Sequence, residues 1–480
     1  MVVQHNMQAA NANRMLNITT NAQSKSTEKL SSGYRINRAA DDAAGLTISE
    51  KMRKQIRGLD QASTNAEDGV SSVQTAEGAL TEVHSMLQRM NELAVQASNG
   101  TNSDTDRSAI QDEISQLTTE IDRVAETTKF NETYLLKGGN GTKDIYMNGH
   151  DAGLKGTLTD GATSATFKVA AGALDAGKSI TIGGKDYSIG ATEAEAKDLV
   201  KAPATDKTST VSVDGKSYSI VDAGGNVTIK DDKGTTLKKS DFTGQAADTA
   251  NATVADLKGI IKAGSTVKVG EKSATVMTDA NTDGVDDTNS SVISAAHAVE
   301  LMTSELTSAN NIGTTKATAT VTAGTYASAT GVEFTIDKGT AEVAEKLSFS
   351  LHVGSDADMT NKINVDIETM NSSYLGIKGI NVNDDTGVAA TYAIDAISDA
   401  ISKVSSQRSA LGAVQNRLEH TIDNLDNVVE NTETAESRIR DTDMAEEMVN
   451  YSKNNILAQA GQSMLAQANQ SNQGVLSLLQ

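Results

Sequence analysis

The chain is 480 residues long, which suits about three domains of roughly 150 residues each, yet only 38% of its residues are hydrophobic and 3% are aromatic. This apolar content lies below the usual ~45–50% and argues against large compact cores. Because the sequence contains no cysteine, disulfide frameworks, thiolate metal sites and cysteine nucleophiles are excluded. The formal charge of −21 argues against binding to nucleic acid or to an anionic membrane, since both need a basic face.

Membrane insertion and signal-peptide cleavage are also not expected. No stretch approaches ~18 consecutive apolar residues, so the sequence predicts no bilayer-spanning helix. The start of the chain holds neither a basic leader nor an apolar run of about 7–15 residues. We therefore expect no cleaved signal peptide, and an exported protein with this sequence would leave the cell by another route.

The amino-terminal part of the chain predicts a pair of helices. Apolar residues recur at alternating spacings of three and four along residues 73–97, the heptad pattern of a helix with a buried seam. The predicted seam consists of Val73, Ala76, Leu80, Val83, Leu87, Met90, Ala94 and Ala97. A similar run over residues 110–124 follows the turn-forming segment 98–106, so the two helices are expected to pack as an antiparallel hairpin.

The middle of the chain, between residues 138 and 387, has a different pattern, with period-two alternation and repeated turn signals. Segments 179–190 (SITIGGKDYSIG) and 210–221 (TVSVDGKSYSIV) are near-copies, and each predicts two short strands around a glycine-containing turn. We therefore predict a β-rich, hairpin-dominated middle.

The carboxyl-terminal part returns to helical spacing, with apolar stripes over residues 394–404 and 411–429 that predict one long helix. A stripe of this length needs a partner to bury it. We therefore expect a mainly α protein at its two ends, with a coiled-coil-like core built from both termini and the chain ends side by side.

The extreme ends carry thinner apolar stripes. Residues 451–480 contain one charged side chain, Lys453. At ~25 cal/mol per Å² such stripes would be marginal alone, so we expect both ends to be disordered in the monomer and to become ordered on self-association. The residues expected to drive polymerisation are Val3, Met7, Ile18, Ile456, Leu457, Met464, Val475, Leu476, Leu478 and Leu479.

Motifs for catalysis are missing from the sequence. The six histidines are dispersed and none forms an HExxH or similar metal-binding spacing. The GKS at residues 215–217 lacks the upstream glycine of a phosphate-binding loop, and no GxSxG occurs. We therefore expect no enzymatic activity and no cofactor.

One segment resembles the start of a calcium loop. Asp279, Asn281, Asp283 and Gly284 match the opening D-x-N-x-D-G, but Ser290 stands where the bidentate glutamate belongs. The segment is a weak calcium-loop candidate, and the alternative is an acidic turn without a metal.

Long colinear blocks at both ends closely resemble the conserved termini of bacterial flagellins. They include LSSGYRINRAADDAAG (residues 30–45), QTAEGALTEVHSMLQRMNELAVQASNGT (74–101), LGAVQNRLEHTIDNL (411–425) and ILAQAGQSMLAQANQSNQGVLSLLQ (456–480). The resemblance implies three domains. Residues 1–44 and 440–480 would form the inner tube of a filament, residues 45–175 and 385–439 a helical core domain with a β-hairpin portion, and residues 176–384 a variable outer domain.

The same resemblance implies a function and partners. Flagellins polymerise into the extracellular filament that drives swimming, so the main partner would be the chain itself in a helical homopolymer. The protein would be exported unfolded through the flagellar type III apparatus, held by an export chaperone beforehand and assembled beneath a filament cap.

The resemblance also implies recognition by the flagellin-sensing Toll-like receptor. The QRMNELAVQ block at residues 88–96 places Arg89 and Leu93 on the expected binding surface, with Glu113 beside them and Arg417 as a further contact. The alternative is that Arg89 and Glu113 are only solvated helix-surface charges. At the chain end, Gln480 replaces the basic last residue usual in the family.

Two other functions remain compatible with these patterns. A hook–filament junction protein would share the terminal helices, and a surface adhesin would use the middle domain to bind glycans or mucus. The extended agreement through QRMNELAVQ and VLSLLQ favours the filament subunit.

Overall fold

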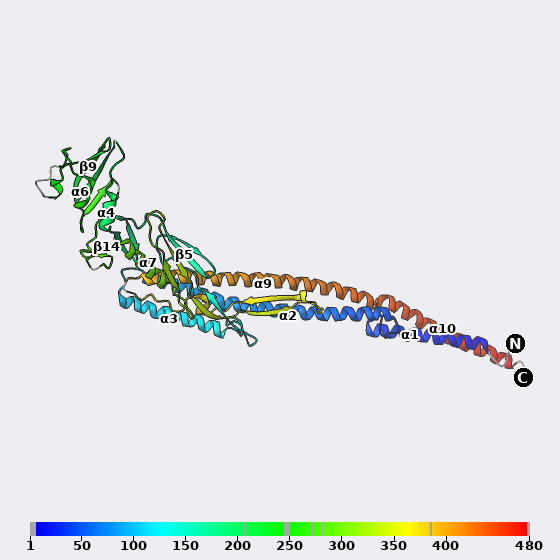
Figure 1. The fold of residues 1–480 in the computed structure, drawn as a ribbon. Coiled ribbons are helices and arrows are strands. Elements are labelled where there is room, and N and C mark those ends of the chain that lie inside the picture. Colours follow the sequence, from blue (N-terminus) through cyan, green and yellow to red (C-terminus); the bar gives the residue numbers. More distant parts are fainter. Residues whose placement is uncertain are drawn as a thin grey trace. The chain divides into compact units, whose positions relative to one another are not determined.

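The computed structural model describes residues 6–205, 207–243, 250–270, 272–280, 282–384 and 386–477, without the side chains of residues 243 and 471–477. The described chain divides into two compact units. Unit 1 comprises Met1–Gln74, Phe349–Val365 and Gly412–Gln480, and unit 2 comprises Thr75–Ser348 and Asp366–Leu411. Figure 1 shows the order of the elements along the chain.

Long helices occupy both ends of the sequence and short elements occupy its middle. The helices are α1 (Met7–Ser32), α2 (Ala43–Ala97), α3 (Asp104–Thr127), α4 (Glu193–Leu199), α5 (Ser240–Thr243), α6 (Val254–Gly259), α7 (Ala295–Asn310), α8 (Ser372–Leu375), α9 (Val388–Arg440) and α10 (Met444–Ser477), with a 3₁₀ turn at Met359–Asn361. The predicted fold class, helical ends around a β-rich middle, is confirmed.

The strands are short and mostly antiparallel. They are β1 (Lys129–Phe130), β2 (Thr133–Tyr134), β3 (Thr142–Tyr146), β4 (Thr157–Asp160), β5 (Ser164–Val169), β6 (Ser179–Ile182), β7 (Lys185–Ile189), β8 (Thr208–Val213), β9 (Lys216–Ala223), β10 (Asn226–Lys230), β11 (Thr266–Val269), β12 (Lys272–Thr275), β13 (Val285–Asp286), β14 (Asn289–Ile293), β15 (Thr320–Ala323), β16 (Val332–Asp337), β17 (Thr340–Ala344), β18 (Leu347–His352) and β19 (Lys362–Ile367). Larger sheets have the orders β10-β9-β8-β11-β12, β13-β14-β7-β6 and β15-β16-β5-β4.

The predicted heptad seam of α2 is confirmed, since each of its eight residues is at most 1% exposed. Helix α3 begins after Ser103, whose side chain accepts a hydrogen bond from the Asp106 amide in a capping box. Helices α2 and α3 form the predicted hairpin, and Arg89 on α2 contacts Glu113 on α3.

A buried arginine closes the turn between α2 and α3. Arg107 is 3% exposed. Its Nε donates to the Ala97 carbonyl at 3.1 Å and its Nη2 to the Asn99 carbonyl at 3.5 Å. The guanidinium therefore caps the carboxyl end of α2, where carbonyls lack intrahelical partners.

We expect Arg107→Ala to lower the free energy of unfolding by roughly 2–3 kcal/mol, because a charged donor to buried carbonyls is lost. Thermal unfolding followed by circular dichroism measures this effect. The control is Arg123→Ala, whose side chain is 62% exposed on the same helix α3. Equal melting temperatures for the two variants would contradict the capping role.

The predicted β-hairpins are confirmed in unit 2. Strands β6 and β7 pair with Ile182 opposite Lys185, and β8 and β9 pair with Val213 opposite Lys216. The first turn contains Gly183 and Gly184 at φ values of 55° and 70°. Tight hairpin turns of this kind need two residues with positive φ, which explains the glycines.

Separate hydrophobic cores, two of them in the β-rich part of the chain, lie in unit 2. In one, Phe167 on β5 and Phe334 on β16 lie with ring centroids 6.0 Å apart and share a core with Met302 on α7. In the other, the five-stranded sheet packs Val211 and Ile220 against Leu257 of α6. Several separate cores, rather than one large core, match the low apolar content of the chain.

A tyrosine in unit 2 gives a pH-dependent prediction. Burial raises the pKa of Tyr326 to about 12, aided by the hydrogen bond from its hydroxyl to Asp175 Oδ1 at 2.8 Å. Because the pKa of Tyr326 is raised in the folded state, the stability that this residue contributes is fully present below the ordinary pKa of 10.0. That contribution is lost as pH rises through about 12. We expect the wild-type melting temperature to fall more steeply than that of Tyr326→Phe in this interval. If the melting temperatures of the two proteins fall equally with pH, the raised pKa does not belong to Tyr326.

In unit 1 the two ends of the sequence pack together, as predicted. The Asn6 side-chain amide on the N-cap of α1 donates to the Ala468 carbonyl on α10 at 3.1 Å. Farther along, Ala66 on α2 and Leu418 on α9 share a core with Ile363 on β19. A Cβ at Gly69 would lie 2.2 Å from Leu351 Cδ1, so a larger residue here would require the end of the Leu351 side chain to shift.

Among the described residues, no helix combines the length and the apolar character needed to cross a membrane. The three-domain division, with 1–44 and 440–480, 45–175 and 385–439, and 176–384, stays a prediction.

Candidate functional site

The terminal helix pair α1 and α10 exposes most of its large apolar side chains. Met7, Ile18, Ile456, Leu457 and Met464, all predicted to drive polymerisation, are between 48% and 73% exposed. Val3, Leu478 and Leu479 lie outside the described residues, as do the side chains of Val475 and Leu476. The role of this set in polymerisation stays a prediction.

Small side chains let the two terminal helices approach closely. A Cβ at Gly461 on α10 would lie 3.3 Å from Leu16 Cδ1 on α1. Beside this contact is a groove of about 570 Å³, lined by Gln8, Asn11, Ala12, Met15, Gly461, Met464, Gln467 and Ala468. The methionines at its edge are flexible apolar side chains that adapt to a partner surface.

Packing within the pair is thin. Ser26 is the buried residue of α1, and Ala458 is the buried hydrophobic residue among the described side chains of α10. Because large apolar side chains stay exposed, the pair keeps apolar surface available for contacts outside itself. Both ends are helical over their described ranges, and the expected ordering on assembly stays a prediction.

A charged joint connects the terminal pair to the rest of unit 1. Tyr34 forms a β-bridge with Asp441, and the Arg35 amide donates to the Arg440 carbonyl at 2.7 Å. Arg440 Cζ lies over the Tyr34 ring, 4.8 Å from the ring centroid. Arg440 Nη1 lies 3.2 Å from Glu50 Oε1 and forms an ion pair with it. Our sequence reasoning missed this joint, because helical periodicity predicts that the chain ends pack together but not which polar side chains, about 400 positions apart, meet there.

The predicted receptor-binding charges form an ion-pair cluster in unit 2. Arg89 Nε donates to Glu113 Oε1 at 2.9 Å, and Arg89 Nη1 donates to Glu92 Oε2 at 3.2 Å. The hydrogen bond to Glu113, followed by that to Glu92, raises the pKa of Arg89. The Arg89 and Glu113 side chains are 50% and 45% exposed, so both can reach a partner. Glu92 was missed by sequence reasoning, although its i, i+3 spacing from Arg89 is a usable signal.

The structure corrects the expected exposure of Leu93. This side chain is 2% exposed and belongs to the buried face of α2 rather than to its surface. Arg417 lies exposed on α9 in unit 1. The accessible predicted contacts in unit 2 are therefore Arg89 and Glu113.

The weak calcium-loop candidate is built from turn hydrogen bonds. The Asp279 carboxylate accepts from the amides of Asp283 and Gly284 at 3.2 and 3.0 Å. Asn281 lies outside the described residues. Within the described ranges no group of three or more acidic or histidine side chains is placed to hold a metal ion.

Thinly packed terminal helices with exposed apolar faces are typical of a structural subunit that associates with copies of itself. Residues 3–141 match the family model described as bacterial flagellin N-terminal helical region, and residues 394–479 match the bacterial flagellin C-terminal helical region. The chain is 39% identical to a flagellin of Clostridium tyrobutyricum over 98% of this chain and 100% of that one. It is 33% identical to a flagellin of Halalkalibacterium halodurans and 35% identical to one of Bacillus subtilis, each over the full length of both chains.

The chain belongs to the bacterial flagellin family and is a subunit of the flagellar filament. These relatives are structural flagellins.

Proposed function

We propose that the protein polymerises through α1 and α10 into the helical filament that drives swimming, outside the cell. The observation that carries this proposal is the exposed apolar face of the terminal pair, where Met15 and Met464 flank a groove of about 570 Å³. Covering one such side chain removes apolar surface from water and stabilises association by ~1.5–3 kcal/mol.

Export as an unfolded chain through the flagellar type III apparatus is part of this proposal. The chain has no cysteine that could cross-link before export. The described side chains of α1 and α10 are mostly not buried, so little energy is needed to hold these helices unfolded on an export chaperone before the cap places them. The test is growth of filaments from purified chain on sheared filament ends, followed by electron microscopy. No growth on compatible ends would contradict the proposal.

The released monomer is, in the same proposal, a ligand of the flagellin-sensing Toll-like receptor. The exposed pair of Arg89 and Glu113 supports this, because an arginine held by carboxylates presents both a planar fork and an apolar stem to a partner. Leu93 has a side chain that is 2% exposed, and its part in receptor binding stays a prediction.

A further inference from the structure

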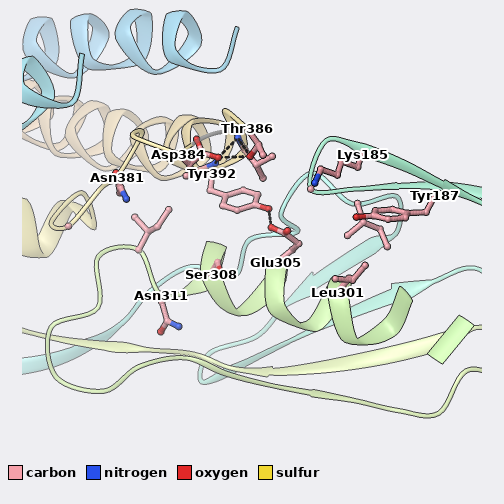
Figure 2. Close-up of a pocket in the computed structure, with 16 residues that line it drawn as sticks. Lys185, Tyr187, Leu301, Glu305, Ser308, Asn311, Asn381, Asp384, Thr386 and Tyr392 are labelled. Atoms are coloured by element: carbon pink, nitrogen blue, oxygen red, sulfur yellow. Dashed lines mark hydrogen bonds between the residues drawn. The ribbon is translucent and has the colours of Figure 1, made fainter. Parts of the chain in front are cut away.

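A cavity of about 490 Å³ lies in unit 2, and its lining includes neither Arg89 nor a residue of the terminal helices. Three segments distant in sequence line it: the β6–β7 hairpin, helix α7 with the residues that follow it, and the start of α9 with the loop before it. Figure 2 shows polar side chains from all three around the same space. Its volume falls in the range of about 300–1,000 Å³ typical of small-molecule sites.

One side of the cavity is fixed by a tyrosine–carboxylate pair. The Tyr392 hydroxyl on α9 donates to Glu305 Oε2 on α7, and Figure 2 shows the two side chains pointing toward one another. Burial, followed by the Glu305 carboxylate, raises the pKa of Tyr392, so this hydroxyl stays a donor at neutral pH. The pairing orients Glu305 and leaves its other oxygen, Oε1, able to accept hydrogen bonds.

The second carboxylate in the cavity wall, Asp384, is hydrogen-bonded to the start of α9. Asp384 accepts from the Thr386 hydroxyl at 2.6 Å and from the Gly387 and Val388 amides at 2.9 and 3.0 Å. Burial raises the pKa of Asp384, but these hydrogen bonds outweigh it and hold the pKa below its usual value. Asp384 therefore caps the start of α9 and uses most of its hydrogen-bonding capacity within the protein.

Three donors line the cavity with hydrogen-bonding capacity to spare. Asn311 and Asn381 use their Oδ1 atoms to accept from the Ala319 and Asn383 amides, which fixes the side chains. Lys185, Asn311 and Asn381 all line the cavity, and the Lys185 ammonium and the two Nδ2 groups have no acceptor among the described residues. Lys185 follows the Gly183–Gly184 turn, which places it at the hairpin tip.

We propose that this cavity binds a short oligosaccharide. Sugar hydroxyls both donate and accept, so they match Glu305 Oε1 as acceptor and the Lys185, Asn311 and Asn381 nitrogens as donors. The apolar face of a sugar ring suits the Tyr187 ring, which lines the same cavity. A free amino acid is less suitable, because it would fill only part of about 490 Å³ and the amide donors would keep no partner. The proposal goes beyond filament formation.

The test measures binding of the full-length monomer to a printed array of neutral and sialylated oligosaccharides of two to four sugars. The strongest binder is then titrated by calorimetry against the wild type and variants. We expect saturable binding that Tyr187→Ala and Lys185→Ala each weaken about tenfold or more. The matched control is Lys178→Ala, an exposed lysine ahead of β6 outside the cavity lining, which should leave the affinity unchanged.

Folding of each variant is checked by its melting temperature. Lys185 is exposed, so its replacement by alanine tests the cavity even if Tyr187→Ala unfolds. No binding to any sugar on the array would overturn the proposal. Binding that both cavity variants leave unchanged, or that glycine or glutamate abolishes by competition, would overturn it as well.

Discussion

A chain without residues 451–480 will fail to grow on sheared filament ends, whereas the full-length chain will form filaments. The deletion removes most of α10, which spans Met444–Ser477, and with it the partner of α1. The cores formed around Leu418 and Leu425 lie outside the deleted segment and are expected to keep unit 1 folded. The truncated protein should therefore stay helical by circular dichroism while it no longer polymerises.

A triple variant tests the apolar surface of α10 while the helix itself is kept. Ile456, Leu457 and Met464 are 67%, 48% and 63% exposed, so changing all three to serine alters the surface of α10 without opening a core. Burial of each such side chain by assembly stabilises the filament by ~1.5–3 kcal/mol. Losing three of them should therefore raise the critical concentration for growth by at least about a hundredfold. The control is Ser452→Ala with Ser463→Ala on the same helix. Growth of the triple variant at the wild-type concentration would show that these side chains are not buried by assembly.

The seam of α2 could be predicted from the sequence because a buried helix face repeats with the helical period. Leu93 was misplaced because it lies outside that strict a and d repeat. It stands at a flanking g position, one residue before Ala94, and the buried stripe of a helix packed in a larger core widens to include e or g positions. The period therefore identified the centre of the buried face but not its width.

The helical period of the sequence could not predict the roles of Arg107 and the cavity residues, because these roles depend on contacts made by the folded chain. Charge at the start of α3 suggests an exposed side chain, yet Arg107 is 3% exposed because it reaches back to carbonyls of the preceding turn. Glu305 and Tyr392 are 87 positions apart and meet only in the folded chain. Such contacts depend on tertiary packing, which local patterns do not encode.

Replacing Arg89 by alanine will weaken binding of the monomer to the ectodomain of the flagellin-sensing Toll-like receptor by about thirtyfold or more. The guanidinium is held by Glu113 on the neighbouring helix and by Glu92 on its own, so it is already oriented before binding. An oriented side chain loses less conformational entropy in an interface than a free one. Surface plasmon resonance with immobilised ectodomain measures the dissociation constant.

The matched control for Arg89→Ala is Arg123→Ala. Arg123 is also exposed and also pairs with a glutamate three residues away, Glu120, but lies outside the QRMNELAVQ block. Both variants remove one positive charge, so a general charge effect would weaken binding equally in the two, and that outcome would contradict a specific contact at Arg89. Exchanging the charges of the pair, Arg89→Glu with Glu113→Arg, restores an ion pair in reverse. If the exchange restores the melting temperature but not the affinity, Arg89 acts through its contact with the receptor rather than through the stability of the hairpin.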